Sequence, residues 1–118
     1  MAKVAVVVLA DTESPGDLGR GVNAMMTAKE LKENNDEVQI VFDGAGTKWV
    51  PTLSNSEHKY HDLFASVRDE IAGVCSYCAS AYGVKNGVQT SGVQLLEDFE
   101  EHPSLRKYIT EGYQIITF

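Results

Sequence analysis

The sequence lacks several features that mark large classes of protein. Its longest apolar run, VAVVVLA at residues 4–10, is far shorter than the roughly 20 residues that span a bilayer, so we expect no membrane association. It carries only two cysteines, too few for the disulfide framework of a small secreted domain. It has no excess of Lys and Arg. The formal net charge of -7 argues against a nucleic-acid partner, and we interpret it as a contribution to solubility.

The first residues, MAKVAVVVLADTE, also lack the charged segment, the longer apolar stretch and the cleavage site of a signal peptide. We therefore predict a cytoplasmic protein, in which cysteines stay reduced unless they take part in catalysis. A chain of 118 residues is expected to form a single domain, residues 1–118, with a core that needs neither a disulfide nor a metal. Stability alone therefore does not require Cys75 or Cys78.

What the sequence does contain is a series of short strand patterns. The β-branched run at residues 4–9 has no polar alternation, which is typical of a central strand covered on both faces. EVQIVFDGAG predicts a second strand that is closed by Gly44 and Gly46. Further strands are predicted around Val74, at residues 93–96 and in the terminal segment YQIITF.

Helical patterns separate these strands. The first helix begins near Asp17, a candidate N-cap, and has one apolar face: Leu18, Val22, Met25 and Met26. After a polar loop that carries Trp49 and Pro51, the clearest amphipathic pattern in the chain follows: Tyr60, Leu63, Phe64, Val67 and Ile71. Shorter helices are predicted at residues 78–83 and 103–112. Strands that alternate with helices form right-handed βαβ units, so we predict an α/β fold, a three-layer α/β/α sandwich around a mainly parallel five-stranded sheet.

The two cysteines fall where such a fold places its functional residues. Function gathers at the carboxyl ends of parallel strands, where the next helix begins, and the predicted third strand ends near Cys75. Cys78 lies at the start of the following helix, whose N-terminus favours a thiolate and can lower the pKa of a cysteine. The C-x-x-C spacing brings both sulfurs close enough for a disulfide or a shared metal. Cys75 could equally be a small buried apolar residue, so Cys78 is the better candidate nucleophile.

The order of these segments resembles the DsrE/DsrF-like family of small sulfur-handling proteins, which includes sulfur-relay members of the TusD type. The resemblance covers essentially the whole chain and rests on five segments: VAVVVLA, GVNAMMTAKEL, VQIVFDGAG, CASAYGV and EGYQIITF. It implies a last strand beside the first. It also implies that the cysteine before the Ala-rich helix, here Cys78, accepts a sulfane sulfur as a persulfide and passes it to a partner protein.

Cys75 departs from the single-cysteine pattern of the relay members. A neighbouring thiol could attack a Cys78 persulfide, release sulfide and leave a Cys75–Cys78 disulfide. Two alternatives to sulfur relay therefore stay open: a thiol–disulfide switch that uses both cysteines, and a non-catalytic oligomeric interaction module with inert cysteines.

A metal site is a further alternative. His58 and His61 have the same two-residue gap as the cysteines, and the four residues supply the ligand types of a Cys2His2 zinc site. The spacing does not match the strong zinc arrangements, so we expect both histidines at the surface or at an edge of the core. One of them could instead lie near the thiols and tune their pKa.

Nothing in the sequence requires an organic cofactor. The loop ADTESPGDLGRG could bind a phosphate, and Trp49 could then stack on a flavin, but no dinucleotide or P-loop glycine pattern is present. We interpret the loop as ordinary turn chemistry and its carboxylates as a solvated rim: Asp11, Glu13 and Asp17. The sequence thus predicts catalytic Cys78 with Cys75 as a resolving or tuning thiol, and neither a cofactor nor a bound metal.

The expected partners are other proteins. The predicted function requires a sulfur donor and a sulfur acceptor. Tyr77 and Tyr82 flank the thiols and could line an apolar mouth or a subunit contact, because aromatic residues are enriched in interface cores. The family resemblance implies a homo-oligomer, either a trimer or a hexamer.

Overall fold

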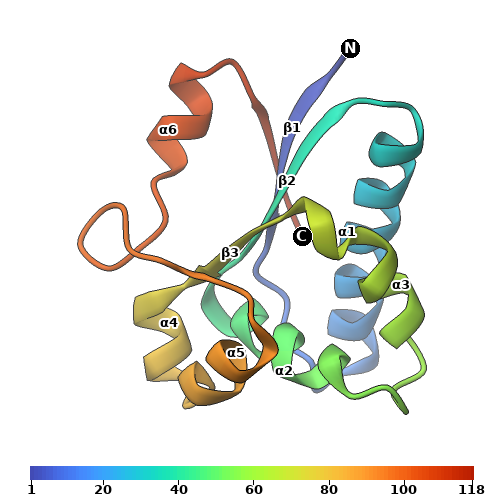
Figure 1. The fold of residues 1–118 in the computed structure, drawn as a ribbon, viewed down its shortest axis with the longest axis vertical. Helices are drawn as coiled ribbons and strands as arrows, with labels where there is room; N and C mark the ends of the chain where they lie inside the picture. The colour runs from blue at the N-terminus through green and yellow to red at the C-terminus, as the bar shows by residue number, and fades with distance from the viewer.

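The computed structural model describes all residues 1–118 as one five-stranded sheet with helices around it (Figure 1). The strands are β1 (Lys3–Val8), β2 (Glu37–Phe42), β3 (Ile71–Cys75), β4 (Leu95–Leu96) and β5 (Gln114–Thr117). The α-helices are α1 (Pro15–Glu33), α2 (Trp49–Ser54), α3 (His61–Val67), α4 (Ser76–Ala81), α5 (Lys85–Ser91) and α6 (Leu105–Thr110). Two 3-10 helices, η1 (Gly44–Lys48) and η2 (Arg68–Glu70), complete the chain.

All neighbouring strands are parallel, in the order β4-β3-β2-β1-β5. The last strand lies beside the first, as the family resemblance implies, with Val4 opposite Gln114. The predicted α/β class with a parallel five-stranded sheet is therefore confirmed.

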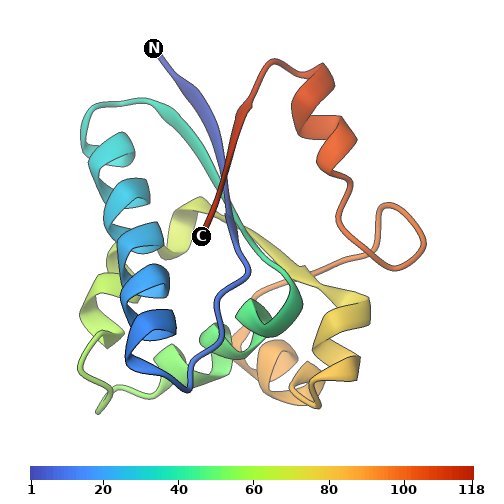
Figure 2. The same ribbon diagram turned by 180° about the vertical axis from the view of Figure 1, so that it is seen from behind.

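The two faces of the sheet are covered unequally. Val4, Val6 and Val8 of β1 face the larger apolar cluster, to which α1, α2, α3, α4 and α5 all contribute buried residues. Ala5 and Val7 face a smaller cluster that is closed by Tyr108 of α6. Figures 1 and 2 show α6 alone on its side of the sheet. The structure thus has the three predicted layers, but one outer layer consists of a single six-residue helix.

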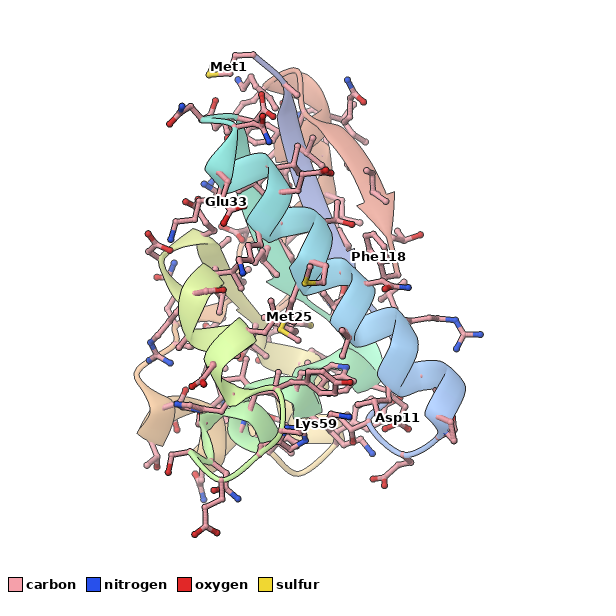
Figure 3. All side chains as sticks on the ribbon, turned by 90° about the vertical axis from the view of Figure 1, so that its right-hand side faces the viewer. Met1, Asp11, Met25, Glu33, Lys59 and Phe118 are labelled. Carbon is pink, nitrogen blue, oxygen red and sulfur yellow. The ribbon has the colours of Figure 1, made fainter.

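Helix α1 differs from the prediction at its start. Its N-cap is Ser14 rather than Asp17: the Ser14 hydroxyl accepts a hydrogen bond from the Asp17 amide at 3.1 Å and donates one to the Asp17 carboxylate at 2.8 Å. Figure 3 shows the helix across the sheet, with Met25 at its buried side. Met26, predicted on the same apolar face, is 50% exposed.

The segment predicted as a polar loop around Trp49 is instead helical and buried. Trp49 begins α2, is fully buried and donates its indole N–H to the carbonyl of Ala10 at 2.9 Å. Gly21 of α1 allows this close approach, because an added Cβ would lie 2.5 Å from Cζ2 of Trp49.

The structure differs from the prediction at two other elements. Ile71 does not continue the apolar stripe of α3, since the chain turns through η2 and Ile71 begins β3. A helix at Lys85–Ser91, α5, was not predicted. No helix in the structure has both the length and the apolar character of a membrane span.

Candidate functional site

Both cysteines lie at the carboxyl edge of the sheet, as the sequence predicts. Cys75 is the last residue of β3, and Cys78 lies in the first turn of α4. The Cys75 sulfur is the N-cap of α4, because it accepts a hydrogen bond from the amide of Cys78 at 3.4 Å. Both thiols are free. The local fold therefore holds the two sulfurs within 4.8 Å of each other without a disulfide.

The two thiols have different surroundings. Cys75 is fully buried, whereas Cys78 is partly exposed. Burial raises the pKa of Cys75 to about 12, and the negative charge of Asp43 acts in the same direction. Cys75 therefore stays protonated near neutral pH, which makes it a poor nucleophile.

A histidine that the sequence analysis did not single out lies against Cys75. The Nδ1 atom of His102 is 3.3 Å from the Cys75 sulfur. His102 ends a tight turn in which it pairs with Phe99, and the two residues between them, Glu100 and Glu101, have φ of 47° and 69°. A positive φ is energetically costly for residues other than glycine, and such residues are concentrated at functional sites. The turn thus holds His102 beside the thiol in a strained backbone.

Tyr77 connects this turn to α4. Its amide donates to the carbonyl of Glu101 at 2.9 Å, and its ring lies 4.8 Å from the ring of His102. The Tyr77 side chain remains 53% exposed. An open cavity of about 370 Å³ adjoins it, lined by Ser76, Tyr77, Ser80, Ala81, Lys85 and Glu101. The cavity is lined in part by residues next to the two cysteines in sequence, but by neither cysteine itself.

Asp43 completes the cluster. It directly follows β2, and because Phe42 pairs with Val74, Asp43 lies beside Cys75 at the sheet edge. One carboxylate oxygen accepts a hydrogen bond from the Gly44 amide at 2.8 Å. One ligand atom from each of four residues lies within 4.8 Å of all the others: Asp43, Cys75, Cys78 and His102. We call this group the thiol cluster.

The predicted alternative with His58 and His61 as metal ligands is wrong. Nδ1 of His58 accepts a hydrogen bond from the Tyr60 amide at 3.0 Å, and Nδ1 of His61 lies 2.6 Å from the carbonyl oxygen of Leu53. His61 lines a separate cavity of about 640 Å³ between α2, α3 and α5. Neither histidine belongs to the thiol cluster.

The carboxylates of the loop after β1 pair with cations. Lys48 lies 2.8 Å from Asp11 and 3.3 Å from Glu13, and the pKa of Asp11 is lowered mainly by its hydrogen bond to Lys48. Asp17 pairs with Arg20 at 2.9 Å. Figure 3 shows Asp11 at the loop before α1. Trp49 is buried and cannot stack on a flavin from this loop. These carboxylates are therefore paired with cations of η1 and α1.

The fold and the thiol cluster define a small parallel α/β protein with cysteines at its carboxyl edge. The chain belongs to the DsrE/DsrF-like family, whose sequence profile matches residues 5–118, and this family is associated with sulfur relay in general. The chain is 36% identical over 95 residues to Uncharacterized protein MJ0733 of Methanocaldococcus jannaschii, covering 80% of this chain and 77% of that protein.

A solved structure supports the same fold. A conserved protein of unknown function from Bacteroides thetaiotaomicron, BT1422, superposes with a TM-score of 0.65. The match covers 97% of this chain and 94% of that protein at 17% identity, so it shows a likeness of fold alone.

Proposed function

We propose that the protein is a cytoplasmic sulfur carrier of the relay type, with Cys78 as the residue that holds the sulfur. Membership of the DsrE/DsrF-like family supports sulfur handling in general. The observation that carries the proposal is the contrast between the two thiols. Cys78 is partly exposed, whereas its neighbour Cys75 is buried with a pKa of about 12.

The loading step is a thiol exchange without net oxidation. The Cys78 thiolate attacks the outer sulfur of a donor persulfide, the donor S–S bond breaks, and the donor leaves as a thiolate. Cys78 then carries one additional sulfur. In the unloading step an acceptor thiolate attacks this outer sulfur, and the Cys78 thiolate leaves. Each step forms one bond to sulfur and breaks one, so no separate oxidant or reductant is needed.

A carrier must not destroy its own persulfide. The competing reaction is attack by Cys75 on the inner sulfur of a Cys78 persulfide, which would release hydrosulfide and form a Cys75–Cys78 disulfide. With a pKa of about 12, Cys75 is a thiolate in roughly one molecule in 100,000 at pH 7. Its buried, protonated state favours a stable carrier over a thiol–disulfide switch, and Cys75 then acts as a tuning residue that caps α4.

Partners of the carrier would be a donor and an acceptor protein, each presenting a thiol to the open side of α4. Tyr77 and Tyr82 are 53% and 46% exposed on this helix and its C-terminal end, and they would form the apolar part of that contact. We further propose that the protein assembles as a homo-oligomer, a trimer or hexamer, as the family resemblance implies.

Intact-mass measurement after incubation with a small persulfide donor tests the proposal. We expect wild type to gain one sulfur atom that a reducing agent removes. Cys78→Ser should gain none. Cys75→Ser is the matched control, because it removes the other thiol of the pair, and it should still gain the sulfur.

Three results would contradict a carrier that uses Cys78. A loss of two hydrogen atoms that requires both cysteines would establish the disulfide switch instead. A mass that stays unchanged would favour the interaction module with inert cysteines. A gain that survives in Cys78→Ser would show that another residue, and not Cys78, carries the sulfur.

A further inference from the structure

We propose that the thiol cluster also binds one Zn²⁺ ion, with Asp43, Cys75, Cys78 and His102 as its four ligands. The four residues come from three separate segments: Asp43 directly follows β2, Cys75 and Cys78 lie at the junction of β3 and α4, and His102 lies in the turn before α6. Convergence of two sulfurs from one C-x-x-C stretch with one imidazole nitrogen and one carboxylate oxygen from elsewhere in the chain is the arrangement of a closed, four-coordinate zinc site.

The distances are close to those of a zinc tetrahedron. With Zn–S near 2.3 Å and Zn–N and Zn–O near 2.0–2.1 Å, the ligand atoms of a tetrahedral site lie about 3.3–3.8 Å apart. The distance from the Cys75 sulfur to Nδ1 of His102 is 3.3 Å, and no pair in the cluster exceeds 4.8 Å. The most distant pair would therefore have to close by about 1 Å on zinc binding.

The surroundings of the ligands support a metal-binding role. The Cys78 amide donates a hydrogen bond to the Cys75 sulfur, and such hydrogen bonds stabilise metal-bound thiolates. Gly44 donates to the carboxylate of Asp43, which fixes that side chain and leaves its other oxygen available. The ring of Tyr77 packs against His102. Asp43 and His102 are thus oriented by residues outside the ligand set, and Cys75 by the backbone of its fellow ligand Cys78.

The donor set selects among metals. Two sulfurs and an imidazole disfavour Mg²⁺ and Ca²⁺, which prefer oxygen ligands, and they suit Zn²⁺, a borderline-soft ion that is stable in tetrahedral S, N and O sites. Binding would release one proton from each thiol, since both cysteines coordinate as thiolates. No ligand position would remain open, so the zinc would be structural or blocking rather than catalytic.

Zinc and sulfane sulfur would compete for the same atom of Cys78. This consequence rests on the proposed function: zinc-loaded protein should not accept sulfur until a chelator removes the metal. Zinc binding itself does not depend on sulfur transfer. A metal titration without any sulfur donor therefore separates failure of this inference from failure of the carrier proposal.

Titration of the reduced, metal-free protein with Zn²⁺ and with Co²⁺ tests the site. We expect one equivalent of zinc with submicromolar affinity, and with Co²⁺ the intense visible bands of a tetrahedral ion together with a thiolate-to-cobalt charge-transfer band. Cys78→Ser and His102→Ala should each weaken binding by roughly 100-fold or more, and Asp43→Asn, which keeps the acceptor for Gly44, by about tenfold.

His58→Gln is the matched control, because it removes a histidine outside the thiol cluster and should leave the affinity unchanged. Circular dichroism of every variant establishes that it is folded. The proposal is overturned if folded wild type binds no tighter than Cys78→Ser, if His102→Ala binds like wild type, or if the cobalt spectrum is that of an octahedral ion without thiolate ligands.

Discussion

The chemical inertness of Cys75 can be measured directly by alkylation of Cys78→Ser, in which Cys75 is the only thiol. The pKa of Cys75 is about 12, whereas an unperturbed cysteine titrates near 8.5. At pH 7 its thiolate fraction is thus lower than that of a free cysteine by roughly three orders of magnitude. Complete burial of Cys75 slows the reaction further.

We expect iodoacetamide to modify Cys75 at least a thousandfold more slowly than a cysteine-containing peptide, by this ratio of thiolate fractions. The rate should rise about tenfold per pH unit without a plateau up to at least pH 10, because the thiolate fraction is still far from saturation. In urea-denatured protein both differences should vanish. A plateau near pH 9, or a rate within tenfold of the peptide, would refute the argument that Cys75 is buried and protonated.

Three further predictions concern stability. Gly21→Ala should lower the free energy of unfolding by about 1–3 kcal/mol in urea melts, because the new methyl group overlaps Trp49, whereas an unchanged midpoint would contradict the packing. Trp49 is the only tryptophan, so its fluorescence should be blue-shifted in the folded protein and move to the red on unfolding. Trp49→Phe should lower the free energy of unfolding by more than about 1 kcal/mol, because it removes the bond to Ala10 and also leaves buried volume unfilled; a smaller loss would contradict this packing. The free energy of unfolding should fall as the pH rises from about 8.5 towards 12, because Cys75 keeps its proton to higher pH in the folded protein than in the unfolded chain. Urea melts of Cys75→Ser should show a weaker fall over this range, and a fall equal to that of wild type would contradict the raised pKa of Cys75.

Much of the fold could be predicted because local pattern and tertiary environment agree. The run Val4–Val8 is apolar at every position, and in the structure it forms a buried inner strand of the sheet, between β2 and β5. The prediction failed where local pattern and packing disagree. The segment around Trp49 and Pro51 contains many polar residues and predicted a loop. In the structure the Trp49 ring packs against Gly21, which is 28 positions away in the sequence, and helical or strand periodicity does not reveal such a long-range contact. Ile71 fits the helical spacing of α3, but the chain reverses through η2 before reaching it.

The candidate site could be predicted only in part. The positions of Cys75 at a strand end and Cys78 in the next helix follow from local sequence. Asp43 carries a usable signal, since it directly follows a buried strand and parallel neighbours end at the same edge. His102 carries none, because the turn that contains it is separated from the thiols by α5 and β4. The histidines nearest in sequence to the cysteines, His58 and His61, were therefore the wrong ones to consider.

The members of the thiol cluster are anchored to the molecule with unequal strength. Asp43 and Cys75 terminate two neighbouring inner strands, so their backbone should become accessible to deuterium only when the whole protein unfolds. His102 rests on an exposed turn between a two-residue edge strand and a six-residue helix, tied to α4 through the Tyr77 amide. We expect the Tyr77 amide to exchange with solvent far sooner than the amides of β2 and β3. Displacement of the imidazole by a partner molecule would therefore leave Cys75 in place at the end of β3 and Cys78 in place in α4.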